Sequence, residues 1–382
     1  MQEIKNMVIP VKKNVLTEKP LPQIMVLVPD LRIPGGVSNY YKTLKLDADP
    51  HVRYFVINEV EQQGAVAAVI RLFKKYCTFS YKLLKKEAKF VVINPSLDEG
   101  KSFYRDMVFI LLTLLFNCKP VVFFRGWFDP FEEKIRHSKF KTFMFNISYA
   151  KAYQYMVLGN TFKQKLLSLG VPASTPFHIE TTVADSTYVS SLNLEQKFAS
   201  YEKELKFLFL SRIEREKGVF IAIDAFTLFV DRFPTRKSIL IIAGDGRDLA
   251  EVKAYVVEKK LQHIRFDGHV STETKKIVLL EAHVMIFPSF TEGLPNVILE
   301  GMLYGFPIIA RGTGGIPEVV DEKVNGYITD SYDAAVFAEL LYPVAFDGEL
   351  YKKMAETNHR KALATYTSEQ VKARIRNIYR HF

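Results

Sequence analysis

The chain has 382 residues, 48% of them hydrophobic, and a formal net charge of +10. This length exceeds one typical hydrophobic core and predicts two domains of roughly 180 residues each. Two cysteines exclude a disulfide framework, and the longest uncharged apolar run, residues 107–118, is shorter than the roughly 20 residues that span a bilayer. Since the first residues also lack the apolar core of a signal peptide, we expect a cytoplasmic protein without a membrane-spanning segment.

The positive charge is confined to the first half of the chain. Residues 1–186 hold 26 Lys and Arg against 16 Asp and Glu, whereas residues 187–382 hold 26 of each kind. Such an excess predicts an anionic partner for the first half, and no recognition-module signature points to nucleic acid. Residues 71–86 mix cations with aromatic and leucine side chains, which is typical of a helix at a membrane interface. The alternative is a domain helix with a solvated lysine face.

Strand-like and helix-like segments alternate along the chain. After a polar extension over residues 1–20, strands are expected at 23–29, 52–57, 90–94, 120–124, 155–158 and 177–180. A polar linker over residues 187–205 precedes strands at 206–210, 238–243, 264–266, 284–287, 307–310 and 327–329. This rhythm predicts an α/β protein with two Rossmann-like, doubly wound domains, residues 21–186 and 206–360, facing each other across a cleft. Residues 361–382 should form a C-terminal helix that packs back on the first domain.

A pair of glycines, Gly35 and Gly36, follows the first predicted strand and precedes a helix. Glycines at such a turn let backbone N–H groups approach a phosphate without a side chain in the way. No Gly-Lys-Ser/Thr sequence follows, so this turn is not a P-loop.

Two loops of the second half also follow strands. The first carries Arg212 and Lys217 on either side of a turn, and two fixed cations there suit a diphosphate. The alternative is that both are surface charges paired with Glu214 and Glu216. The second loop, around Gly244, is another glycine-rich turn that permits close backbone approach.

The segment from residue 288 to residue 300 reads as a strand end, a loop and a helix start. Pro295 suits the first helical position, and the amides of Leu294, Asn296 and Val297 should then point out of the helix mouth, which attracts anions. Glu292 precedes that mouth and Glu300 lies more than a turn inside the helix at 297–304. We expect the two carboxylates to bind different parts of one elongated ligand. The alternative is that both are ordinary solvated glutamates.

Together these motifs resemble the retaining nucleotide-sugar glycosyltransferases of family 4, also called glycosyl transferases group 1, which have the GT-B fold. The resemblance lies in Ser-Arg-x4-Lys-Gly, Ala-Gly-Asp-Gly, the Glu-x7-Glu pair within Glu-Gly-Leu-Pro-Asn, the Gly-Thr-Gly-Gly-Ile-Pro-Glu sequence and a final Asn-Gly-Tyr. Order and spacing match from about residue 205 to 330. The first half matches only through its glycine pair and its alternation of strand-like and helix-like segments.

The resemblance implies a donor site in the second domain and an acceptor site in the first. Arg212 and Lys217 would bind the donor diphosphate, Glu300 the ribose hydroxyls and Glu292 the donor sugar. Gly35 and Gly36 would approach the diphosphate from the first domain. The remaining donor-binding residues implied are Gly244 and the segment Gly293, Leu294, Pro295 and Asn296.

Arg125 departs from the family pattern, because many members carry a histidine after the corresponding first-domain strand. An arginine stays charged at neutral pH, so it would add a cation near the phosphates or bind an acidic acceptor. The alternative is a simple ion pair with Asp129. The nearby Trp127 either stacks on an acceptor sugar or packs in the core.

These expectations define a retaining hexosyltransferase that needs no metal and no cofactor, because fixed cations stabilise the leaving diphosphate. Its partners would be a nucleotide-sugar donor, a saccharide or lipid-linked acceptor and an anionic membrane surface at the cytoplasmic face, in the synthesis of surface polysaccharide or glycan. The alternatives are a sugar-nucleotide epimerase of the same fold and a non-catalytic saccharide-binding subunit.

Overall fold

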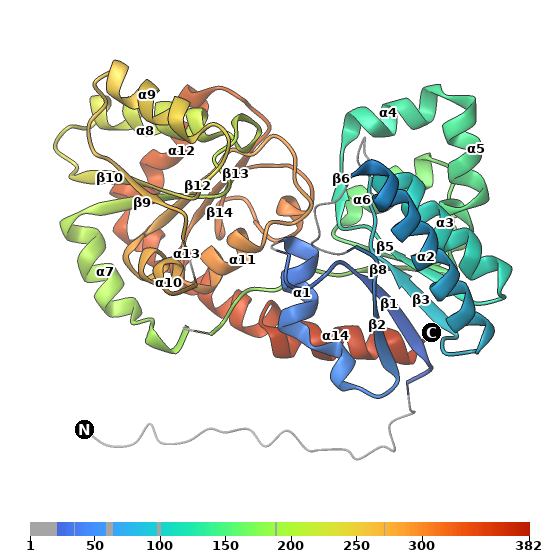
Figure 1. The fold of residues 1–382 in the computed structure, drawn as a ribbon. Helices are drawn as coiled ribbons and strands as arrows, with labels where there is room; N and C mark the ends of the chain where they lie inside the picture. Colours follow the sequence, from blue (N-terminus) through green and yellow to red (C-terminus); the bar gives the residue numbers. More distant parts are fainter. Residues whose placement is uncertain (1–20, 34, 59–63, 98–100, 188, 271) are drawn as a thin grey trace, which may run out of the picture.

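The structure is a computed structural model, and it describes residues 21–33, 35–58, 64–97, 101–187, 189–270 and 272–382. Two α/β domains lie side by side, each built on a six-stranded sheet whose strands are all parallel (Figure 1). The predicted fold class is thus confirmed, and each strand expected from the sequence is present. Buried parallel strands read as continuous apolar runs, which is why the sequence marks them so clearly.

The first sheet has the strand order β2-β1-β3-β5-β7-β8. Its strands are β1 (Ile24–Val28), β2 (Val52–Val56), β3 (Phe90–Ile93), β5 (Lys119–Phe123), β7 (Gln154–Val157) and β8 (Phe177–Ile179). Two short strands, β4 (Ser96–Leu97) and β6 (Gly126–Trp127), pair beyond its carboxyl edge. The helices are α1 (Gly36–Leu44), α2 (Ala65–Leu84), α3 (Lys101–Leu115), α4 (Asp129–His137), α5 (Lys139–Ile147) and α6 (Asn160–Ser168).

The second sheet has the strand order β11-β10-β9-β12-β13-β14. Its strands are β9 (Leu205–Leu210), β10 (Ser238–Ala243), β11 (Ile264–Gly268), β12 (Val284–Phe287), β13 (Ile308–Arg311) and β14 (Gly326–Thr329). Its helices are α8 (Val219–Arg232), α9 (Leu249–Glu258), α10 (Thr272–Glu281), α11 (Asn296–Leu303), α12 (Ala334–Phe346) and α13 (Gly348–Thr365). The strand order reverses between β1 and β3 in one sheet and between β9 and β12 in the other. Such switch points are where doubly wound sheets bind ligands.

Two details differ from the sequence expectation. The stretch predicted as a linker contains the helix α7 (Leu194–Lys203), whose Tyr201 stacks on Tyr351 of α13 with ring centroids 4.0 Å apart. The side chain of Asn193 caps this helix by accepting a hydrogen bond from the Gln196 amide, a signal that the sequence did contain. In addition, Pro295 is the N-cap residue of α11 and not its first helical residue, because its ψ of 128° is still extended.

The last helix, α14 (Ser368–Arg380), crosses beneath the first domain (Figure 1) and packs against α1. Its Val371, Ile375 and Tyr379 are buried, and Arg374 pairs with the Glu180 carboxylate at 2.8 Å. The chain therefore crosses between the domains twice.

Loops of the two domains also touch directly. The Asn160 amide at the start of α6 donates to Glu318 Oε1 at 2.6 Å, and Thr291 Oγ1 donates to the Trp127 carbonyl at 3.2 Å. These contacts hold the carboxyl ends of both sheets against each other. The space between them is the candidate site.

Candidate functional site

A cavity of ≈ 510 Å³ lies between the domains, lined by loops that follow β1, β3, β5, β9 and β12. Ten of the twelve predicted site residues line it, from both domains: Gly35, Gly36, Arg125, Arg212, Lys217, Glu292, Gly293, Leu294, Pro295 and Asn296. A second cavity of ≈ 480 Å³ contains Glu300 and shares Asn39 and Asn296 with the first. The two cavities are therefore adjacent, which suits one elongated ligand.

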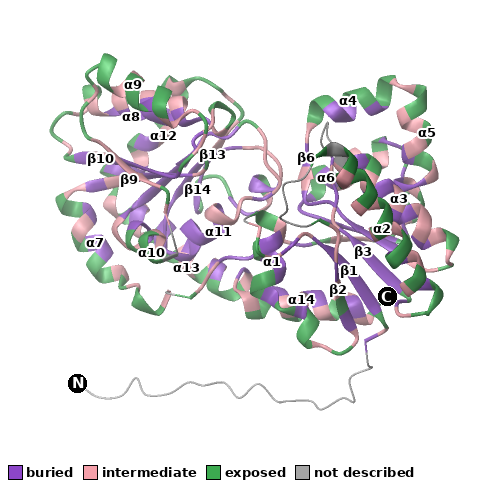
Figure 2. Ribbon diagram, in the orientation of Figure 1, coloured by how far each residue is buried: buried purple, intermediate pink, exposed green. Residues whose placement is uncertain are grey.

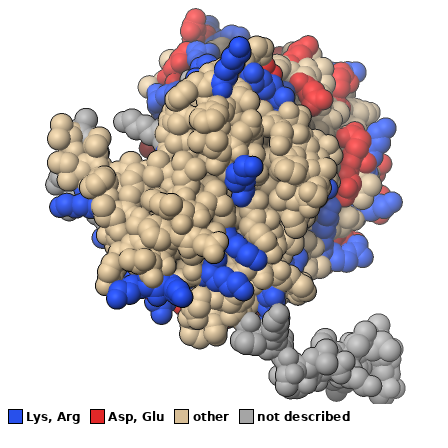
Figure 3. Space-filling model, turned by 90° about the vertical axis from the view of Figure 1, so that its right-hand side faces the viewer, with Lys and Arg blue, Asp and Glu red and all other residues tan. Residues whose placement is uncertain are grey.

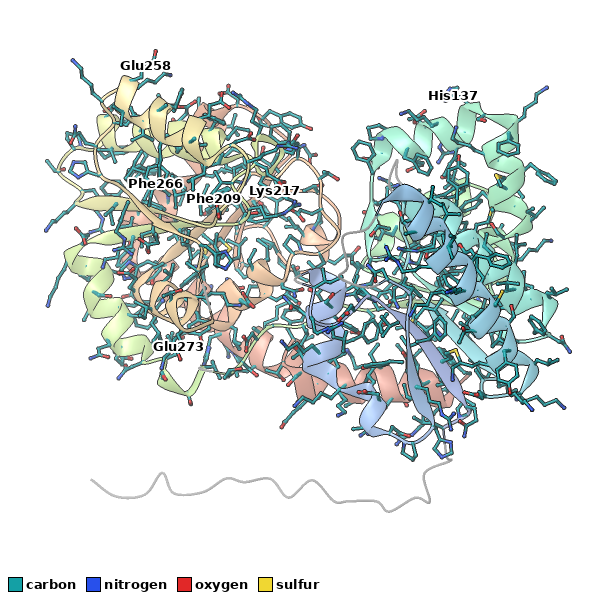
Figure 4. The ribbon with its side chains drawn as sticks, viewed as in Figure 1. His137, Phe209, Lys217, Glu258, Phe266 and Glu273 are labelled. Carbon is teal, nitrogen blue, oxygen red and sulfur yellow. The ribbon has the colours of Figure 1, made fainter. Side chains whose placement is uncertain are left out.

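Lys217 and Glu292 form an ion pair at the wall of the first cavity. Lys217 Nζ lies 2.6 Å from Glu292 Oε1, and Ser289 Oγ donates to the same oxygen at 2.7 Å. Both charged side chains are largely buried, with 14% and 13% of their surface exposed. Figure 4 shows Lys217 at the side of the second domain that faces the first. The pair thus presents one fixed cation and one fixed carboxylate to whatever enters the cavity.

Arg212 is held more loosely. Its side chain is 68% exposed and pairs with Glu214 at 2.8 Å, which is the contact that the alternative interpretation expected. The Glu216 carboxylate pairs instead with Arg247. An exposed ion pair contributes little free energy, so an anion in the cavity competes easily for the Arg212 guanidinium.

Arg125 is the buried cation of the first domain. Its guanidinium lies over the rings of Tyr40 and Phe123, 4.1 and 4.4 Å from their centroids. Among the described residues, its Nε and Nη1 atoms have no hydrogen-bond partner. Asp129, the partner that the alternative expected, pairs with Lys165. A buried cation without a carboxylate favours an anionic ligand, because burial of unpaired charge is costly.

The glycines of the site serve different purposes. A Cβ added at Gly36 would meet nothing within 4 Å, so the protein's own packing does not require this glycine, and the open space belongs to the cavity. A Cβ at Gly293 would lie 2.3 Å from the Arg125 carbonyl oxygen, so that glycine lets the two domains approach each other.

Gly244 lies outside both cavities, and its conformation serves the contact between two loops. Its φ is 147°, and an added Cβ would lie 1.8 Å from the Ser211 carbonyl oxygen. We expect Gly244→Ala to lower the free energy of unfolding by about 2 kcal/mol or more, measured by urea denaturation. Gly36→Ala is the matched control and should leave stability nearly unchanged. Equal stability of the two variants would contradict this account of Gly244.

Glu300 is buried at the head of the second cavity, on α11. Lys275 of α10 pairs with its Oε1 atom at 2.8 Å and lies 4.0 Å from Asp185, whereas Oε2 has no partner among the described residues. Burial raises the pKa of Glu300, and the Lys275 ammonium opposes that rise. Sequence reasoning missed Lys275, since only the folded chain brings α10 against α11.

Trp127 packs inside the first domain. It is buried, stacks on Phe162 with ring centroids 5.5 Å apart, and donates from Nε1 to Glu132 at 2.7 Å. The indole ring is therefore part of the core, and the Trp127 carbonyl accepts a hydrogen bond from Thr291 of the second domain.

Comparison with known proteins supports the reading of these motifs. Residues 191–361 match the family model of glycosyl transferases group 1. The amylovoran biosynthesis glycosyltransferase AmsK of Erwinia amylovora is 26% identical over 48% of this chain and 45% of its own length. The N-acetyl-alpha-D-glucosaminyl L-malate synthase of Bacillus anthracis is 24% identical over 49% of this chain and 48% of its own length. The chain thus aligns with about half the length of these curated relatives.

Solved structures match over nearly the whole chain. Anabaena Alr3699/HepE in complex with UDP has a TM-score of 0.73 at 14% identity, covering 94% of this chain and 100% of that one. The sucrose-phosphate synthase of Thermosynechococcus elongatus has a TM-score of 0.73 at 16% identity, covering 94% and 98%. At such low identities these matches establish the fold, which is GT-B.

Proposed function

We propose that the protein is a glycosyltransferase that moves a hexose-type sugar from a nucleotide-diphosphate donor to a saccharide or lipid-linked acceptor, because residues 191–361 match the family model of glycosyl transferases group 1. The observation that carries this proposal is the convergence of Lys217 and Arg125, from opposite domains, on one cavity. Among the described residues, Arg125 Nε and Nη1 have no hydrogen-bond partner. Both cations suit the diphosphate of such a donor.

The charges of the cavity fit the reaction. As the bond between the sugar and the diphosphate breaks, positive charge grows on the anomeric carbon and negative charge on the leaving diphosphate. Arg125, Lys217 and Arg212 would stabilise the leaving group more than the bound donor, which lowers the barrier without a metal ion. Glu292, fixed by Lys217 and Ser289, would hold hydroxyls of the donor sugar.

We further propose that the anomeric configuration is retained. The acceptor oxygen would attack from the face that the diphosphate leaves, and a phosphate oxygen would take the acceptor proton. Glu300, in the cavity adjacent to the one that Glu292 lines, would accept hydrogen bonds from the ribose hydroxyls.

Similar proteins support this class of donor and product. One HepE structure contains UDP-glucose, and AmsK is named for the biosynthesis of amylovoran. We propose a role in the synthesis of surface polysaccharide or glycan at the cytoplasmic face of a membrane, with an anionic lipid surface as a partner of the basic first domain.

The proposed function is tested by measuring nucleoside diphosphate release from UDP-, GDP- and ADP-sugars with EDTA present and washed membranes as the acceptor source. Release from one donor that depends on the membranes is the expected result. Loss of release on adding EDTA would overturn metal independence. Conversion of a donor to its epimer without membranes would favour the epimerase, and donor binding without turnover of any kind would favour a non-catalytic subunit.

Lys275→Met should weaken the binding of the nucleoside diphosphate about tenfold at neutral pH. Without the ammonium, the already raised pKa of Glu300 rises further, so more of the carboxyl is protonated at a given pH and fewer hydrogen bonds can be accepted. As the pH is lowered, the affinity for the nucleoside diphosphate should therefore begin to fall at a higher pH in the variant than in the unmodified protein. Asp185, Lys42 and Lys45 also face this cavity and are unchanged in the variant.

Calorimetric titrations across a pH series measure this shift. Lys253→Met, which removes an exposed lysine of α9, is the control. An unchanged pH profile for Lys275→Met would show that Glu300 does not contact the nucleotide.

A further inference from the structure

Helix α2 turns an apolar stripe toward solvent as well as one toward the core. Its inner side buries Phe79 and Leu83, and Phe79 packs on Phe55 and Phe109. On the outer side, the side chains of Val69 and Phe73 are 69% and 67% exposed. Figure 2 shows most of α2 exposed along the outside of the first domain. A domain helix that buries one stripe has no packing reason to carry the second.

The outer apolar surface extends over the neighbouring helices. α3 lies between α2 and α5 and contacts both. The exposed apolar side chains on this face, here called the outer face, are Val66, Val69, Ile70, Phe73, Tyr81 and Leu84 of α2, Tyr104 and Leu115 of α3, and Phe140 and Phe143 of α5. Figure 3 views the first domain from this side and shows a broad surface on which the charged side chains are a few scattered Lys and Arg.

The charges on helices α2 and α5 of the outer face are all positive. Neither α2 nor α5 contains an acidic residue, while α2 carries four cations and α5 carries Lys139 and Lys141. Exposed Lys85 and Lys86 follow directly after α2. In Figure 3 Lys and Arg lie on and below the apolar surface, and acidic side chains gather toward its upper right edge. A second copy of the chain is a poor occupant, because docking two such faces would bring like charges together.

We infer that the outer face docks on an anionic lipid surface, with the apolar side chains entering the headgroup region and the lysines contacting lipid phosphates. Among the described residues, no helix is long and apolar enough to cross a membrane. The inference deepens the proposed function, since it names the surface from which a membrane-bound acceptor would reach the enzyme. The docking itself needs neither donor nor acceptor.

The test uses the full chain, labelled with an environment-sensitive fluorophore at Cys77, which is exposed on α2. Burial raises the pKa of the other thiol, Cys118, which disfavours its labelling. We expect a blue shift and flotation with vesicles that contain phosphatidylglycerol, and much less of either with phosphatidylcholine alone. Because no nucleotide sugar is present, this result is independent of whether the proposed reaction occurs.

Val69→Ser combined with Phe73→Ser should weaken vesicle binding about tenfold or more. Lys74→Gln combined with Lys85→Gln should weaken binding to anionic vesicles by about tenfold and make it less sensitive to salt. Val257→Ser combined with Ile277→Ser, which changes apolar residues equally exposed on the second domain, should bind as the unmodified chain does.

Equal binding by the Val69/Phe73 variant and the Val257/Ile277 variant would overturn the inference, as would equal binding to both kinds of vesicle. A chain that is dimeric in sedimentation and becomes monomeric in the Val69/Phe73 variant would assign the outer face to a second copy instead.

Discussion

Lys217→Met is expected to lower the rate of sugar transfer about 10²- to 10³-fold. The ammonium is fixed beside the cavity by Glu292, so it costs no reorganisation when negative charge develops on the diphosphate. Steady-state rates of nucleoside diphosphate release measure the effect. Lys237→Met, which removes a 77% exposed lysine of the second domain, should leave the rate unchanged.

Glu292→Gln completes the comparison. Because Lys217 and Glu292 share one contact, their effects should not add, and the double variant should be little slower than the slower single variant. Transfer at the unmodified rate in both single variants would show that this ion pair only joins two loops. Strictly additive effects would show that each side chain acts in a separate place.

Most of the fold could be predicted from the sequence, but less of the candidate site. Strand β12 is an uninterrupted apolar run and β9 is one after Lys206, and burial on both faces of a parallel sheet accounts for such runs. The loops that follow them were therefore placed correctly at the cleft. Helix boundaries were harder to predict. Proline fixes φ but not ψ, and the extended ψ of Pro295 makes it the N-cap of α11 and not its first helical residue.

Pairings between distant residues could not be predicted. The Asp129 carboxylate is taken by Lys165, which leaves Arg125 without the partner that sequence proximity suggested. Glu300 meets Lys275 only because α10 packs beside α11. For α2 the sequence left two interpretations open, because residues 66–84 hold apolar side chains on two sides and periodicity does not say which side faces the sheet.

Replacing Arg125 by methionine is expected to separate activity from stability. Transfer should fall about 100-fold, because the cavity loses the cation of the first domain. The free energy of unfolding should change by no more than about 1 kcal/mol, since removing an unpaired buried charge offsets the loss of its contacts with the Tyr40 and Phe123 rings. Rates of transfer and urea denaturation curves measure the two effects.

Arg136→Met is the matched control, and its effects should be the reverse. Arg136 pairs with the buried Glu132 at 2.5 Å, away from the cavity, so its loss should lower stability by about 1–3 kcal/mol and spare transfer. A loss of stability in Arg125→Met as large as that in Arg136→Met would show that Arg125 is a structural residue.

The ligand that Arg125 contacts follows from binding measurements on the same variant. If Arg125 contacts the donor diphosphate, Arg125→Met should weaken the binding of the nucleoside diphosphate and leave that of the nucleoside unchanged, since only the former carries the charge that the guanidinium attracts. If nucleoside diphosphate binding is unchanged and the KM for acceptor rises, the cation instead binds an acidic acceptor. The position of Arg125 on the first domain, opposite Lys217, allows both contacts, but only the first places two cations on one leaving group.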